Sequence, residues 1–546
     1  MVSFETNLFL ISLFSYLTNF IQMNSKKLIL IALFALCQTS LIYAGGILTN
    51  TNQSAHFIRM VARDASTQID AAYTNPAGLV KLEDGLHFSF SNQSAFQTRT
   101  ITSTFAPFAG FGGDATKRFK GTASAPMVPS LQAAYKRGKW VLSGNIAVTG
   151  GGGKATFNSG LPSFESGISM LPHLLKSAGI DASQYSVDAY MRGSSFIYGA
   201  QIGGSYAIND MFSVYGGFRL NIVNNGYEGH LRNISFNPQH ALNPSGGMVS
   251  AQSFFNDAAD LAKGTATQLN AFIEAGAGAY TVSQLIAAGQ MSQAMANQLN
   301  AGLGGIEGFE SMQIQQVQGA YLLAGQTYEA NAKNVADKNL DSSQSGWGIS
   351  PIIGFNFNYN DLNIGMKYEF RTALNVENQT KIDDTGLFGD GVNTPHDIPA
   401  LFTIGASYQI TPKLLASVGY HHFFDSDAEM ANSKQKHING GTNEYLFGAE
   451  YQIDRMFLVS AGAQITRYGV QDAYQQDLSF SINSYSVGLG GAVNVAPKVK
   501  INVGYFWTTY SDWTKKVDNY NGTPLSGTDV FSRTNKVFAA GVDFSF

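Results

Sequence analysis

Residues 353–371 read IGFNFNYNDLNIGMKYEFR, and this stretch decides the fold. Apolar side chains occupy every second position, and Gly, Asn, Lys, Glu and Arg fill the positions between them. The alternation pauses around Asn360-Asp361 and then resumes. A period of two is typical of β-strands with one apolar and one polar face, and a short Asn/Asp break is typical of a tight turn. The segment therefore predicts two antiparallel strands.

The same alternation recurs from about residue 86 to the end of the chain, and its interruptions alternate in length. Six are short turns, at 137–138, 208–210, 359–361, 410–412, 453–455 and 496–497. Seven are long and polar, at 100–125, 150–193, 233–345, 380–396, 428–442, 470–478 and 512–533. This parity predicts about fourteen strands with both chain ends on the side of the short turns, as in outer-membrane barrels. A soluble β-sandwich is disfavoured, because its strands are usually shorter than the ten or more residues seen here.

Composition favours a membrane environment. Charged residues make up 13% of the chain, about half of the roughly 25% usual in soluble domains, and aromatic residues make up 12%. Beyond the N-terminus there is no apolar stretch of about 18 residues that could form a membrane helix. Because lipid cannot satisfy free backbone groups, we expect an all-β, transmembrane antiparallel β-barrel. The net charge of −4 argues against a nucleic-acid partner.

The N-terminus has the order of a secretory signal. Lys26 and Lys27 precede the apolar run 28–36, and a polar break then leads to Ala44. We expect residues 1–44 to be a cleaved signal peptide, with Met23 as an alternative true start, and the mature protein to reside in the cell outer membrane. The only cysteine, Cys37, lies inside the signal, so cleavage would leave no thiol chemistry.

The chain ends on Phe546 in an amphipathic strand. A terminal aromatic residue of this kind resembles the signal that the barrel-assembly machinery reads. We therefore expect that machinery as a partner during biogenesis. We also expect outer-membrane lipid as the surroundings and a monomeric protein.

Residues 45–85 do not alternate and contain few charges, so we expect an N-terminal hatch that plugs the lumen. The segment begins with Gly45-Gly46, continues through Asp64-Ala65-Ser66 and closes on Asn75-Pro76-Ala77-Gly78 just before the first strand. These features, with the fourteen-strand count over residues 86–546, resemble the FadL/TodX family of outer-membrane transporters of long-chain fatty acids and aromatic hydrocarbons.

The resemblance implies a channel for passive, hatch-gated uptake of hydrophobic small molecules. In that family, the ligand is captured by outer loops, enters the lumen and leaves sideways through a gap made by an inward kink of the third strand. The candidate kink here is Gly150, Gly151, Gly152 and Gly153, since glycine inside a strand marks a bulge or bend. The alternative interpretation is a flexible start of the second outer loop.

The third outer loop, 233–345, changes from strand to helical periodicity. Its Met and Leu residues, among them Leu285, Met291 and Leu299, could receive a hydrophobic ligand or could simply pack the loop. We therefore expect a partly helical loop.

A ligand that is an acid needs a cation in the lumen. Strand parity turns Arg219, Lys367 and Arg371 inward, although neighbouring carboxylates such as Glu369 can neutralise them. The sequence contains no catalytic motif, so we expect no enzyme, no cofactor and no metal site. Two other functions remain open, a general porin and a non-transporting surface barrel that serves as an adhesin or phage receptor.

Overall fold

The computed structural model describes residues 49–546. The predicted signal peptide 1–44, the alternative start Met23, Cys37 and the first residues of the predicted hatch, 45–48, lie outside the described residues. No helix within residues 49–546 combines the length and the hydropathy needed to cross a membrane.

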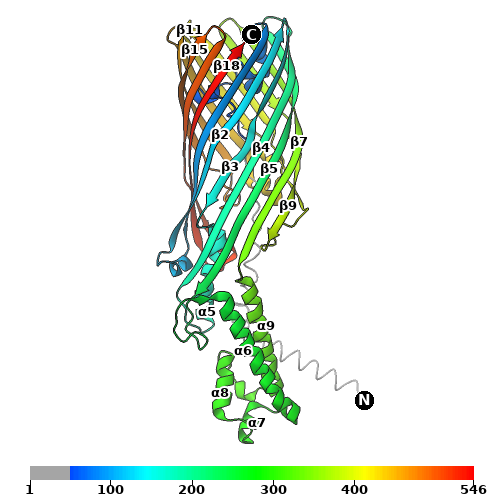
Figure 1. The fold of residues 1–546 in the computed structure, drawn as a ribbon, viewed down its shortest axis with the longest axis vertical. Coiled ribbons are helices and arrows are strands. Elements are labelled where there is room, and N and C mark those ends of the chain that lie inside the picture. The colour runs from blue at the N-terminus through cyan, green and yellow to red at the C-terminus, as the bar shows by residue number, and fades with distance from the viewer. Residues whose placement is uncertain (1–48) are drawn as a thin grey trace, which may run out of the picture.

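The described chain forms a closed antiparallel β-barrel (Figure 1). Eighteen strands form one sheet, and four of them (β6, β9, β10 and β17) are short pieces in the outer loops, which leaves fourteen in the wall. The ring closes where β1 pairs with β18 over the whole length from His87–Ser545 to Thr104–Thr528. The fold class predicted from the alternation is confirmed. The wall strands are β1 Gly85–Thr104, β2 Thr116–Arg137, β3 Trp140–Phe157, β4 Tyr185–Ala207, β5 Phe212–Phe236, β7 Lys338–Tyr359, β8 Leu362–Glu369, β11 Leu401–Thr411, β12 Leu414–Phe423, β13 Ile438–Gln452, β14 Phe457–Val470, β15 Ser484–Ala496, β16 Val499–Tyr510 and β18 Gly527–Ser545.

The six short turns lie at one end of the barrel, together with the C-terminus (Figure 1). At the other end the strands run further than the alternation indicates. β5 continues to Phe236 and β7 begins at Lys338, so the third outer loop spans 237–337. The outer parts of these strands leave the apolar environment, and both of their faces therefore carry polar residues, which removes the period-two signal.

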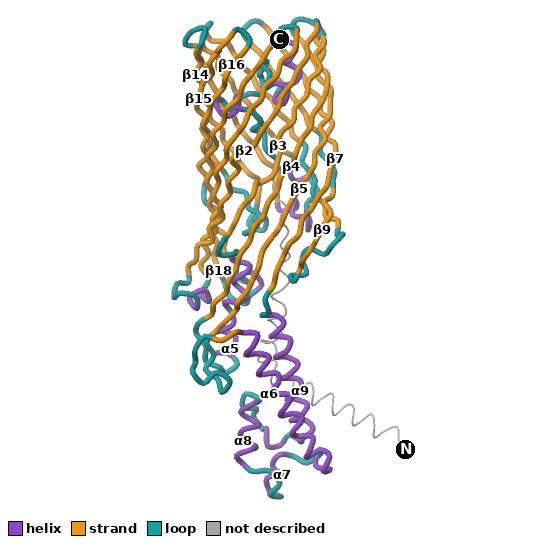
Figure 2. The backbone as a smooth tube through the Cα atoms, viewed as in Figure 1, coloured by secondary structure: helices purple, strands orange, loops and turns teal. Residues whose placement is uncertain are grey.

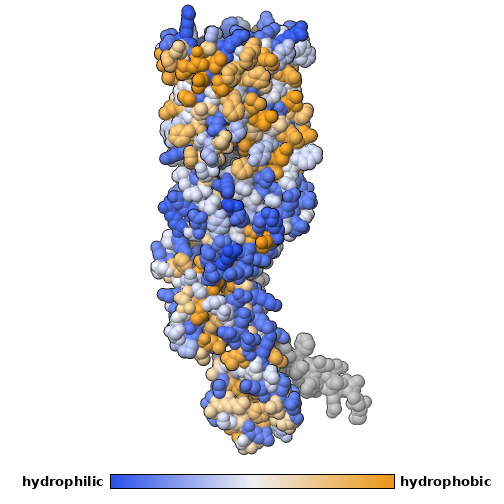
Figure 3. Space-filling model, viewed as in Figure 1, coloured by the Kyte–Doolittle hydropathy of each residue, from blue (hydrophilic) through white to orange (hydrophobic). Residues whose placement is uncertain are grey.

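On the face seen in Figure 3, an apolar band covers the half of the barrel next to the short turns, and the outer half is hydrophilic. Aromatic side chains within about four positions of a short turn or of the C-terminus are exposed on its edge, namely Tyr135, Trp140, Tyr359, Tyr408, Tyr451, Phe457 and Phe546. On β7, Trp347 is exposed twelve positions before Tyr359. With a rise of about 3.3 Å per residue and a tilt of about 40°, this separation corresponds to roughly 30 Å, the thickness of a membrane's apolar core.

The residues before β1 fold inside the barrel. They contain the helices α2 Ala55–Arg59 and α3 Ala71–Thr74 and the 3-10 helix Pro76–Lys81. Nearly every side chain between residues 53 and 79 is buried. The outer end of the lumen is filled separately, by an apolar cluster that includes Ile101, Phe157, Phe480 and Phe531.

The outer loops carry the remaining elements. Helices α4 Pro162–Ser169 and α5 Leu171–Ser177 lie in the second loop, and β9 Asn375–Asp383, β10 Asn393–Pro395 and β17 Trp513–Val517 extend neighbouring wall strands. The third loop contains β6 Val249–Ser250 and the helices α6 Ala251–Phe272, α7 Val282–Ala287, α8 Gln293–Gly302 and α9 Ile314–Asn334. These helices project beyond the barrel (Figure 2). Leu285, Met291 and Leu299 are buried in the projection's own core, so they pack the loop.

Candidate functional site

The Asn75-Pro76-Ala77-Gly78 turn fixes the end of the hatch to three wall strands. The Asn75 amide donates to Ser66 O at 3.0 Å and to Asn356 Oδ1 on β7 at 2.8 Å. Ser205 on β4 donates to the carbonyl of Pro76, and Ser213 on β5 donates to that of Ala77, both at 2.7 Å. Gly78 leaves space for the Asn75 side chain, which an added Cβ would overlap.

Buried ion pairs hold the middle of the hatch. Glu450 on β13 accepts from Arg59 at 2.6 Å and from Arg63 at 3.0 Å, and Arg63 also pairs with Asp70 at 2.7 Å. Because an uncompensated charge is expensive in such surroundings, each partner depends strongly on the others.

A second buried group ties the hatch to β12. The ring of His421 lies between Asp64 of the hatch and Glu444 of β13, with each nitrogen 2.8 Å from a carboxylate oxygen. Both ring nitrogens must carry a proton for both hydrogen bonds to form.

Lumen-facing glycines give the hatch its close approach to the wall. On successive strands from β8 to β16, an added Cβ would meet hatch residues Asp64, Met60, Val61 or Ile58. These glycines are Gly365, Gly405, Gly419, Gly448, Gly462, Gly488 and Gly504. A side chain at any of them would push the hatch away from the wall, so the hatch is a fitted plug rather than a loose segment.

Strand β3 carries the predicted glycine break, and the ladder to β4 is irregular there. Five steps along β3, from Val148 to Gly153, oppose only three steps along β4, from Tyr198 to Ser195. β3 therefore contains two extra residues at this point. Gly151 has φ of 100°, and an added Cβ would overlap the carbonyl of Ser195, so only glycine fits.

The same break separates β3 from β2. The two strands pair at Ala123–Ala155 and again at Leu131–Ile146. Between these points, residues 124–130 of β2 do not pair with residues 147–154 of β3. Pro126 and Pro129 lie in the unpaired part of β2. Proline has no N–H to donate, so it belongs where a strand has a free edge. These prolines were the signal that the sequence reasoning missed.

The first described hatch residues lie directly on this break. The backbone N–H of Asn50 donates to the backbone carbonyl of Thr149 at 2.9 Å. The side chain of Gln53 donates through Nε2 to the carbonyl of Val148 at 3.1 Å. Asn52 also exchanges hydrogen bonds with Gln93 of β1. The start of the hatch, the β3 break and β1 are therefore in contact.

A cavity of about 310 Å³ lies between the hatch and the outer apolar cluster. Asn50 and Asn52 line it from the hatch, residues 151–153 line it from the break, and Phe157 and Phe480 line it from the apolar cluster. Its volume is at the lower end of the range of about 300–1,000 Å³ typical of small-molecule sites. The cavity thus reaches from the outer cluster to the gap in the wall.

The three predicted carboxylate contacts are not brought together. Arg219 donates to both Glu369 oxygens, at 2.6 and 3.0 Å, and Lys367 pairs with Glu369 at 2.6 Å. Lys367 also donates to the Tyr73 carbonyl of the hatch. Arg371 lies beyond the end of β8, is 42% exposed and pairs with Asp397. Arg219 and Lys367 therefore hold Glu369 and the hatch, away from the cavity.

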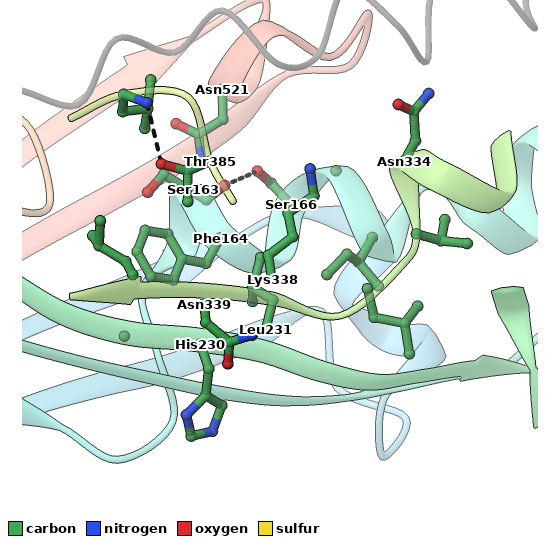
Figure 4. Close-up of a pocket in the computed structure, with 17 residues that line it drawn as sticks. Ser163, Phe164, Ser166, His230, Leu231, Asn334, Lys338, Asn339, Thr385 and Asn521 are labelled. Carbon is green, nitrogen blue, oxygen red and sulfur yellow. Dashed lines mark hydrogen bonds between the residues drawn. The ribbon is translucent and has the colours of Figure 1, made fainter. Parts of the chain in front are cut away.

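A second, smaller pocket of about 160 Å³ opens among the outer loops (Figure 4). Phe164 and Ile168 of α4 and Leu231 of β5 give it an apolar lining, and His230 and Lys338 add polar groups. It lies on the outer side of the apolar cluster, which shares Leu340 with it.

The wall, the apolar band and the internal plug define a membrane-spanning β-barrel with an N-terminal hatch. The crystal structure of a FadL homologue from Pseudomonas aeruginosa has this fold, with a TM-score of 0.54 and 12% identity over 92% of this chain and 100% of that chain. The toluene transporter TodX of Pseudomonas putida gives a TM-score of 0.49 and 13% identity over 91% of this chain and 99% of that chain.

No protein-family model matches the sequence, and the curated proteins contain no sequence match. At 12% identity the FadL homologue establishes the fold alone. The resemblance to the FadL/TodX family noted in the sequence is confirmed at the level of the fold.

Proposed function

We propose that the protein is an outer-membrane channel that takes up hydrophobic small molecules, long-chain fatty acids or hydrocarbons, by passive diffusion and releases them sideways into the membrane. The observation that carries this proposal is the unpaired stretch between β2 and β3, which a cavity reaches from inside. Met127, in the middle of the unpaired part of β2, is 76% exposed, as expected of a residue that faces lipid.

The proposed route passes through the outer pocket, the cavity and the gap in the wall. The ligand enters at the outer pocket near Phe164, passes the apolar cluster and occupies the cavity above the hatch. It leaves between residues 124–130 and 147–154, where no backbone ladder has to be broken. Lateral exit avoids moving the whole hatch, which is held by buried ion pairs and fitted against seven glycines.

We assign gating to the first described residues of the hatch, 49–53. Residues 49–53 touch the break through a few hydrogen bonds, whereas the segment 55–78 is fixed by buried ion pairs and close packing. Segments with few buried contacts open at the lowest free energy. Detachment of residues 49–53 from Thr149 would widen the connection between the cavity and the gap while the rest of the plug stays in place.

The fitted plug argues against a general porin, because a porin lumen is an open aqueous channel. The helical projection α6–α9 is compatible with an additional surface contact, but it does not explain a cavity that opens to the wall.

Uptake measurements distinguish these functions. In a Gram-negative host that lacks its own channels for hydrophobic compounds, the protein should increase uptake of radiolabelled oleate or toluene. In planar bilayers it should show little steady ion current. Large steady currents together with unchanged hydrophobic uptake would contradict the proposal and favour a porin.

A further inference from the structure

Two arginines without a carboxylate partner among the described residues lie in the lumen at the seam where the barrel closes. Arg99 of β1 and Arg533 of β18 are direct partners in the ladder. Both have the odd-numbered parity of lumen-facing positions on their strands, like Gln93 and Val537, and both line the 310 Å³ cavity. Two like charges directly opposite each other destabilise a sheet. The barrel thus retains an unfavourable pair at its cavity.

Neither arginine is neutralised within residues 49–546. Arg99 donates one long hydrogen bond, 3.5 Å, to Phe480 O, and its guanidinium lies 4.6 Å from the centre of the Phe480 ring. Arg533 donates to Gln97 Oε1 at 2.8 Å. The Nε atoms of both side chains are buried and have no hydrogen-bond partner. A buried donor without an acceptor is costly, which points to an acceptor that binds there.

The cavity itself has a marked charge asymmetry. Its described lining contains Arg99, Arg533 and Lys154 but no aspartate or glutamate. Lys154 directly follows the glycine break and is exposed. Elsewhere in the lumen, Arg59, Arg63 and Arg219 are each paired with a carboxylate. Arg99 and Arg533, which have no carboxylate partner, are therefore the exception among the described lumen arginines.

We infer that Arg99 and Arg533 form the binding site for the carboxylate of an amphipathic ligand whose apolar tail occupies the rest of the cavity. This inference rests on the proposed function and selects between its two cargo classes, an acid with a long apolar tail and an uncharged hydrocarbon. The guanidinium edge formed by Nε and Nη matches a carboxylate in a two-point geometry, and both edges are free at Nε. Val128, Val148 and Phe157 line the same cavity and provide apolar contact for the tail.

The test compares one ligand with and without its charge. The mature full-length protein in dodecyl maltoside is titrated with cis-parinaric acid, a fluorescent fatty acid, and with its methyl ester. The wild-type protein should bind the acid at least about tenfold more tightly than the ester, since hydrogen bonds to charged groups contribute about 1.5–3 kcal/mol and each 1.4 kcal/mol is a factor of ten.

Substitutions then locate the selectivity. Arg99→Gln and Arg533→Gln should each weaken binding of the acid about tenfold and leave binding of the ester within about twofold. Arg99→Lys and Arg533→Lys, which keep the charge but lose the planar edge, should fall between. Lys536→Gln, on the outer face of β18, removes the same charge outside the lumen and should change neither affinity. The glutamine variants should melt at or above the wild-type temperature without ligand, because one of two opposed like charges is gone.

Equal affinity of the wild-type protein for acid and ester overturns the inference. So does a glutamine variant that weakens both probes equally, or neither. If the ester still enters cells through the protein while the acid has no advantage, the inference fails and the proposed channel stands. If neither probe binds or enters, both fail.

Discussion

Removing Gly151 and Gly152 should close the gap in the wall. β3 carries two residues more than β4 between Val148 and Gly153, so deleting two restores a continuous ladder. The six remaining unpaired residues of β3 can then pair with β2, with one residue of β2 left over as a bulge. Seven residues of β2, 124–130, are unpaired with β3, and at about 3.3 Å per residue they span about 23 Å.

The effect on opening follows from the bonds that form. Six residue pairs give about six hydrogen bonds, and Pro126 and Pro129 remove up to two. At about 1 kcal/mol each, some four bonds stabilise the closed wall by about 4 kcal/mol. This free energy corresponds to a fall of roughly three orders of magnitude in the open population. Uptake through the gap should therefore drop to background.

The assay is uptake of radiolabelled oleate by a host that lacks its own channel for hydrophobic compounds, with assembly checked by the gel-mobility shift on heating. Deletion of Gly112 and Gly113 is the matched control, because both lie in an outer loop with open space around them. Uptake at the wild-type rate by an assembled barrel that lacks Gly151 and Gly152 would refute lateral exit at this break.

Three further predictions concern the hatch and the outer loops. Glu450→Gln leaves Arg59 without any ion-pair partner among the described residues, which should weaken hatch docking by about 3–5 kcal/mol and raise ion conductance. Glu377→Gln, on the exposed face of β9, is the control and should change neither hatch docking nor conductance. Gly488→Ala places a methyl group against the carbonyl of Ile58 and should make the hatch more sensitive to protease, at a cost of about 1–3 kcal/mol, while Gly216→Ala, which meets open space, should leave it unchanged. Lys434, in the outer-loop 3-10 helix Ala431–His437, has its pKa lowered to about 7 by burial and by the charges of Arg99 and Lys515, with Asp477 opposing. Because the ordinary pKa of lysine is 10.5, the unfolded state binds more protons than the folded state between about pH 7 and 10.5. The free energy of unfolding of the wild-type protein should therefore rise with pH across that window by more than about 1 kcal/mol relative to Lys434→Met. Parallel melting curves of the two proteins from pH 6 to 10 would count against this assignment.

The sequence predicts the membrane-embedded half of the fold well, for a physical reason. Lipid outside and polar lumen inside impose strict alternation, as in 353–371, and the turns between such strands must be short and polar. Outside the membrane the outer face of a strand meets water, and the outer extension of β5 to Phe236 carries polar residues on both faces, so it leaves no periodic signal.

The candidate site was only partly accessible to sequence reasoning. The glycine run 150–153 marks the break because a bend needs residues without side chains. Parity placed Arg219 and Lys367 in the lumen with Glu369 as a neighbouring carboxylate, and the fold adds that Lys367 also holds the hatch. The pairing of Arg99 with Arg533 depends on the register between the first and last strands of the wall, which alternation cannot supply.

A reversible lock across the gap tests the central claim most directly. Val128 of β2 and Val148 of β3 line the same cavity on the two sides of the break. The only natural cysteine, Cys37, lies in the predicted signal, so a Val128→Cys, Val148→Cys double variant can be bridged selectively with a short, reducible bifunctional thiol reagent. Oleate uptake should stop on bridging and return when the bridge is reduced, whereas the reagent should not stop uptake by either single variant. Undiminished uptake by the bridged protein would contradict exit between β2 and β3.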